Sequence, residues 1–135
     1  MAVATIDHVN IRTAHLPETI GFYTEGLGMA VELPPGFKSF ENGAWVMGAD
    51  GHPVIHLVRA LEGVDAFGTP FEVEPDTSGS GTIDHIALNC NDYDSMKARL
   101  ERAGYALRFN EAPEFNIRQI LLFDPNDIKV ELNFR

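Results

Sequence analysis

The chain has 135 residues, of which 44% are hydrophobic and 22% charged, values typical of one globular domain with its own core. Its formal net charge of −10 argues against nucleic acid or an anionic membrane surface as a partner. The single cysteine, Cys90, excludes an intramolecular disulfide. Because no run of about 18 apolar residues and no signal-peptide pattern occurs, we expect a cytoplasmic protein without a membrane span.

The first half of the chain predicts the element order β-α-β-β-β. Pro17 suits the first turn of a helix that Gly26 and Gly28 end, and Asp50 with Gly51 is typical of a hairpin turn. We therefore predict a helix that begins at Leu16, preceded by a strand over residues 2–12 and followed by strands over residues 29–33, 44–47 and 53–58.

The second half repeats this order after a segment rich in glycine, proline, serine and acidic residues. Asn91 or Asp92 is expected to cap a helix that Gly104 ends. The other elements are strands over residues 82–90, 105–109, 116–123 and 128–134. The chain thus reads as a single domain with a first module over about 1–60, a linker over about 61–81 and a second module over about 82–135.

A short motif opens each module. Thr5-Ile6-Asp7-His8 recurs as Thr82-Ile83-Asp84-His85, with apolar residues following at matching places. A repeat of this length is one supersecondary unit used twice. Because strand side chains alternate, each copy has an apolar face that can pack on a helix and an opposite face that presents a histidine.

Four residues are candidates for a metal site. Aligning Leu57 with Leu132, in the last strands of the modules, sets His56 opposite Glu131. If the modules pair about a pseudo-twofold axis, these two converge with His8 and His85, and imidazoles with a carboxylate are typical ligands of a divalent metal. A lone strand histidine is more often a core or surface residue. His56 is either a direct ligand or an acid/base group beside the metal.

The chain resembles the vicinal oxygen chelate superfamily, which includes glyoxalase I, extradiol dioxygenases, methylmalonyl-CoA epimerase and proteins of fosfomycin and bleomycin resistance. The resemblance implies an α+β fold in which two βαβββ modules form an incomplete curved barrel around a metal site, in a homodimer. His8, His85 and Glu131 match the family's two-histidine, one-glutamate ligand set. The motifs that carry the resemblance are Ile6-Asp7-His8-Val9, Phe22-Tyr23-(x)3-Leu27-Gly28, Ile83-Asp84-His85-Ile86 and Asp124-Pro125-Asn126-(x)3-Val130-Glu131-Leu132.

The resemblance leaves the reaction open. Glyoxalase I usually has a fourth ligand at the position of His56, a glutamate or glutamine. Ring-cleaving dioxygenases have a histidine near there, but also a tyrosine shortly before the glutamate, where this chain has residues 120–123 without one. We lean to an extradiol-type dioxygenase with Fe2+, while Mn2+, Ni2+, Zn2+ or Co2+ would suit a glyoxalase-type lyase, isomerase or epimerase. A non-catalytic drug-binding resistance protein is the third reading.

A small-molecule substrate with two neighbouring oxygens is common to both catalytic readings. Arg12 lies on the same strand face as His8, and Arg118 is expected on a neighbouring strand, so either can pair with a substrate carboxylate. Trp45 is a candidate wall for an apolar part of the substrate, although core packing or a surface ion pair is the commoner role for each such residue.

Overall fold

Two four-stranded mixed sheets form the framework of the protein, as a computed structural model that describes residues 2–65 and 68–135 shows. In the first sheet the strand order is β1-β4-β3-β2, and β1 runs parallel to β4. A helix and a π-helical turn, α1 and η1, connect β1 to β2. The bounds are β1 Val9–Thr13, α1 Leu16–Gly21, η1 Phe22–Gly26, β2 Ala30–Glu32, β3 Gly43–Met47 and β4 Pro53–Arg59.

The second sheet repeats this topology with the order β5-β8-β7-β6 and β5 parallel to β8. The α+β class and the two βαβββ modules are therefore confirmed. The side chain of Asp92 caps α2 by accepting from the backbone N–H of Ser95, and Gly104 ends the helix with φ +85°. The bounds are β5 His85–Cys90, α2 Tyr93–Ala103, β6 Arg108–Ala112, η2 Pro113–Phe115, β7 Ile117–Phe123 and β8 Lys129–Phe134.

The strand predicted over residues 105–109 begins three residues too early, and the strand predicted over residues 2–12 begins only at Val9. The observed strand β6 begins at Arg108, because its antiparallel partner β7 pairs Arg108 with Leu121 and Ala112 with Ile117. Tyr105 instead packs against the first module, with its ring centroid 5.2 Å from that of Phe22. The apolar pattern of this segment was interpreted as a strand, whereas Tyr105 contacts the first module through its side chain and lies outside the sheet.

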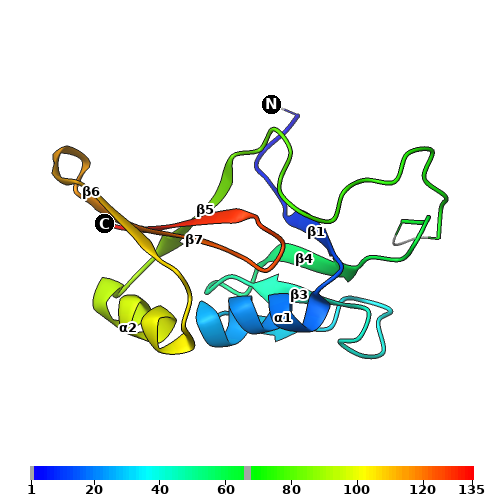
Figure 1. Ribbon diagram of the computed structural model, residues 1–135, viewed down its shortest axis with the longest axis horizontal. Coiled ribbons are helices and arrows are strands. Elements are labelled where there is room, and N and C mark those ends of the chain that lie inside the picture. Colours follow the sequence, from blue (N-terminus) through cyan, green and yellow to red (C-terminus); the bar gives the residue numbers. More distant parts are fainter. Residues whose placement is uncertain (1, 66–67) are drawn as a thin grey trace.

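The helices of the two modules lie side by side against one face of the sheets (Figure 1). Arg99 of α2 donates to the backbone oxygen of Glu25 at 2.8 Å, which joins α2 to η1. Apolar strand residues such as Leu57 and Leu132 are fully buried beneath this layer. Burial of that strand face leaves the opposite face of each sheet to carry the polar residues, including the histidines.

A buried polar network joins the first module to the turn at residues 124–127. Tyr23 donates its hydroxyl to Asp124 Oδ2 at 3.0 Å, while Thr13 donates to Asn126 Oδ1 at 2.5 Å. Asn126 Nδ2 in turn donates to Thr19 at 3.1 Å. Buried polar groups are costly unless they are bonded in this way, so the network holds the modules in one relative arrangement.

The described residues form no closed barrel, and the incomplete curved barrel around a metal stays a prediction. The two sheets stay separate within residues 2–65 and 68–135, because the modules pack through helices and the turn at residues 124–127. The segment between β4 and β5 carries only isolated bridges among its described residues and runs away from the helical layer (Figure 1). None of the described helices has both the length and the apolar character needed to cross a membrane.

Candidate metal centre

The first half-site, which consists of His8 and His56, lies on the helix-free face of the first sheet. His56 of β4 is in register with Asn10 of β1 and Trp45 of β3, so these side chains share one face. The His8 and His56 rings lie 6.2 Å apart, and both contact Trp45: His56 is stacked at 4.4 Å, and His8 meets the indole edge-on at 4.9 Å. Trp45 therefore fixes the orientation of both imidazoles.

The hydrogen-bond partners of the two imidazoles differ. His8 Nδ1 lies 2.6 Å from Asp7 Oδ2, and a carboxylate only accepts, so Nδ1 carries the proton and Nε2 keeps a free lone pair. The same contact lowers the pKa of Asp7. Asn10 presents its amide nitrogen to His56 Nδ1 at 3.3 Å, and an amide nitrogen only donates. The proton of neutral His56 therefore lies on Nε2, as suits a hydrogen-bond donor and not a metal ligand.

His56 Nε2 is buried and has no hydrogen-bond partner among the described residues. Burial, with a smaller contribution from His8, lowers the pKa of His56 and favours its neutral form. A buried donor without a partner is costly, so such groups occur where a ligand completes them. The Nε2–H group of His56 therefore has hydrogen-bonding capacity that the described residues do not use.

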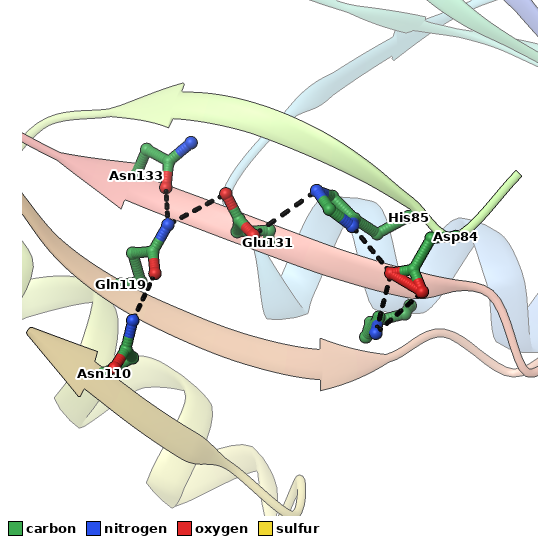
Figure 2. A network of polar contacts seen from close by, with 7 residues as sticks. Asp84, His85, Asn110, Gln119, Glu131 and Asn133 are labelled. Carbon is green, nitrogen blue, oxygen red and sulfur yellow. Dashed lines mark hydrogen bonds and ion pairs between the residues drawn. The ribbon is translucent and has the colours of Figure 1, made fainter.

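The second half-site, which consists of His85 and Glu131, lies on the helix-free face of the second sheet (Figure 2). His85 Nδ1 is 2.9 Å from Asp84 Oδ2, and Lys129 also bonds that carboxylate at 2.8 Å. These hydrogen bonds lower the pKa of Asp84. As in His8, the carboxylate at Nδ1 directs Nε2 of His85 outward, which is the arrangement of metal-binding histidines.

The spacing within the second half-site fits a common metal ion. His85 Nε2 and Glu131 Oε2 lie 3.3 Å apart. Two ligand atoms at neighbouring coordination positions, each about 2.1 Å from a divalent ion, are separated by about 3.0–3.4 Å. The donor types and this separation therefore both suit a metal.

One chain does not unite the two half-sites. No group of three or more histidine, cysteine, aspartate or glutamate side chains able to hold a metal occurs in the described part of the chain. His56 and Glu131 nevertheless occupy equivalent positions in the two sheets. His56 pairs with Asn10, which lies two residues after His8, and Glu131 pairs with Ala87, which lies two residues after His85. Each module thus contributes matching positions that remain apart within the chain.

The two candidate arginines lie outside both half-sites. Arg12 Nη2 donates to the backbone oxygen of Leu61 at 2.6 Å and to Glu74 at 2.8 Å, so it holds the segment between the modules. The guanidinium of Arg118 lies 4.0 Å over the ring of Tyr93, on the helix side of β7 and therefore on the face opposite to Glu131. The pairing of either arginine with a substrate carboxylate therefore stays a prediction.

Sequence reasoning missed Asn10 and Gln119. Asn10 sets the proton position of His56, and Gln119 Nε2 donates to Glu131 Oε1 at 2.9 Å. Both stand on the same strand face as a candidate ligand, which strand alternation does indicate. Their contacts cross from one strand to another, however, and these depend on a register that the chain alone does not display.

Comparison with known proteins gives a family and several similar folds. A family model described as the Glyoxalase/Bleomycin resistance protein/Dioxygenase superfamily matches residues 5–132. No curated protein matches the chain.

Three of the solved structures that match span nearly all of the chain. Lactoylglutathione lyase from Agrobacterium tumefaciens is 16% identical, with a TM-score of 0.67, and the match covers 99% of this chain and 96% of that chain. The fosfomycin resistance protein FosX from Listeria monocytogenes is 12% identical, with a TM-score of 0.66 and coverage of 98% and 94%. The antibiotic binding protein TnmS3 from Streptomyces sp. is 20% identical, with a TM-score of 0.64 and coverage of 99% and 98%. At these identities the matches show a shared fold.

Proposed function

The chain belongs to the glyoxalase/bleomycin resistance/dioxygenase superfamily, and on that premise we propose that it is a divalent-metal-dependent enzyme. Its substrate is a small molecule that binds the metal through two neighbouring oxygens. The observation that carries the proposal is the second half-site, where His85 Nε2 and Glu131 Oε2 lie 3.3 Å apart while Asp84 bonds His85 Nδ1. A histidine and a carboxylate at this spacing can coordinate the same metal ion.

The site is proposed to form between two copies of the chain. His8 of one copy would join His85 and Glu131 of the second copy, and a twofold axis would create two such centres. Two observations support this pairing: the half-sites do not meet among the residues described for one chain, and apolar side chains near them are exposed, as Ile6 at 79% and Ile83 at 62% show. Exposed apolar groups beside polar half-sites favour a contact that covers them.

Each side chain then has a distinct task. His8, His85 and Glu131 would hold the metal, which supplies a Lewis acid that stabilises an enolate- or catecholate-like anion when bound. His56 would donate a hydrogen bond from Nε2 to a substrate oxygen, and the contact of its Nδ1 with Asn10 favours this orientation. Trp45 braces His56 by stacking and offers the remaining indole surface to a planar substrate.

Oxygen-dependent cleavage of a ring diol with Fe2+ is the reaction that we favour. A three-ligand set leaves coordination positions open, and His56 is arranged as a donor beside it rather than as a fourth ligand. A proton-transfer lyase, isomerase or epimerase with Mn2+, Ni2+, Zn2+ or Co2+ is the alternative. The fold shared with lactoylglutathione lyase and FosX agrees with it, and TnmS3 represents the non-catalytic drug-binding alternative.

Elemental analysis of untagged protein purified anaerobically tests the proposal. We expect about one metal per chain in the wild type and none in His85→Ala or Glu131→Ala, with unchanged circular dichroism in all three. Iron together with oxygen uptake on adding catechols would support ring cleavage. Another divalent metal without oxygen uptake would favour proton transfer. Absence of metal after reconstitution, or full metal content in either variant, would overturn the proposed centre.

A further inference from the structure

The side-chain amide of Gln119, on β7, is fully engaged next to Glu131. Its nitrogen donates to Glu131 Oε1 at 2.9 Å and to Asn133 Oδ1 at 2.9 Å, and its oxygen accepts from Asn110 Nδ2 at 2.7 Å. Figure 2 shows these contacts, which continue from Glu131 to His85 and from His85 to Asp84. Three amide side chains on three strands are thereby connected to the candidate metal ligand Glu131.

This row fixes which end of the amide meets Glu131. Gln119 is in register with Asn110 on β6 and with Asn133 on β8, so it lies between two amides on one sheet face. Because a carboxylate only accepts, Glu131 requires the nitrogen end of Gln119. Asn110 satisfies the oxygen end on the other side, so the orientation is determined from both directions.

The matching position in the first module shows that the fold does not require this amide. Glu131 pairs with Leu121, and Gln119 lies two residues before Leu121. In the first module His56 pairs with Trp45, and Gly43 lies two residues before Trp45. Gly43 carries no side chain, and an added Cβ there would lie 2.8 Å from the Phe37 ring and 2.5 Å from the backbone oxygen of Leu57. The amide is therefore specific to the half-site that contains the carboxylate.

The contact divides the two oxygens of Glu131 between two tasks. Oε1 is taken by Gln119, while Oε2 faces His85 Nε2 at 3.3 Å. We propose that Gln119 is a positioning residue that makes Glu131 bind the metal through Oε2 alone and holds that oxygen at its distance from His85. This inference rests on the proposed metal centre and adds a residue that acts through one of its ligands.

Co2+ binding to Gln119→Leu tests the inference. Leucine has a similar volume but no donor, so the contact with Glu131 is lost while the strand is kept. We expect Co2+ affinity, measured by competition with a chromogenic chelator, to fall by about tenfold or more, the usual cost of losing a group that supports a ligand. The released carboxylate can also bind through both oxygens, which would change the visible absorption of Co2+.

Two controls separate positioning from a general loss of structure. Asn110→Leu removes the far contact of Gln119 without touching Glu131, so it should cost less affinity than Gln119→Leu. In a Glu131→Ala background, where residue 131 has no side-chain oxygen to accept from Gln119, the added Gln119→Leu change should leave the weak residual Co2+ affinity unaltered. Urea unfolding of the metal-free proteins should give similar midpoints for the wild type and both leucine variants.

The outcomes distinguish this inference from the proposed function. Wild-type protein that binds no Co2+ would overturn both. Wild-type binding that depends on Glu131, combined with unchanged affinity and absorption in Gln119→Leu, would overturn only the role of Gln119. An equal loss in the presence and absence of the Glu131 carboxylate would also overturn it, because Gln119 would then not act through that residue.

Discussion

Complementation between two inactive variants tests whether one metal centre draws on two chains. His8→Ala removes a ligand from the first half-site, and Glu131→Ala removes one from the second. Within one chain these half-sites do not form a joint metal-binding cluster among the described residues. If centres form between copies, a heterodimer of the two variants has one centre with both lesions and one centre with none.

The expected metal content follows from the number of intact centres in each dimer. Each homodimer of a variant has a lesion in both centres and should bind no metal. The heterodimer should recover about half of the wild-type metal content, because one of its two symmetry-related centres is intact. The assay is co-expression of the two variants with different tags, sequential affinity purification, tag removal and elemental analysis.

A matched heterodimer provides the control. His85→Ala and Glu131→Ala lie in the same half-site, so their heterodimer has one lesion in each centre and should hold no metal. Recovery in the first heterodimer but not in the second would support the shared centre. No recovery in either, or a monomer by sedimentation at micromolar concentration, would refute the reasoning.

Three further predictions concern His56 and Tyr23. His56→Gln should keep the metal content of the wild type, because the contact with Asn10 leaves the proton on Nε2; loss of metal by elemental analysis would instead make His56 a ligand. Tyr23→Phe should lower the free energy of unfolding by about 1–3 kcal/mol in urea denaturation, since the buried Asp124 loses a donor, whereas the half-buried Tyr105→Phe should cost much less. Burial and Asp124 raise the pKa of Tyr23, so above about pH 10 the unfolded chain releases this proton while the folded chain retains it. Wild-type stability should therefore decline more steeply there than that of Tyr23→Phe, and parallel declines would contradict this account.

Alternation and repetition made much of the candidate site predictable. The recurrent Thr-Ile-Asp-His motif identified His8 and His85, and the period of two placed His56 and Glu131 opposite the buried leucines. The observed register bears out the equivalence of His56 and Glu131. Alternation predicted the start of strand β6 wrongly, because Tyr105 packs on Phe22 of the first module and does not pair in the sheet.

The amino-acid sequence by itself determined the two β-α-β-β-β modules, because helix and strand periods and the capping glycines are local properties. It also determined which strand faces carry imidazole and carboxylate groups. The tertiary structure alone decided how the modules meet, through the buried bonds of Asp124 and Asn126 to the first module. It also decided that the half-sites stay apart within a chain and that Gln119 reaches Glu131. The physical reason is that such contacts join residues distant in sequence, and their register and packing are set only when the whole core forms.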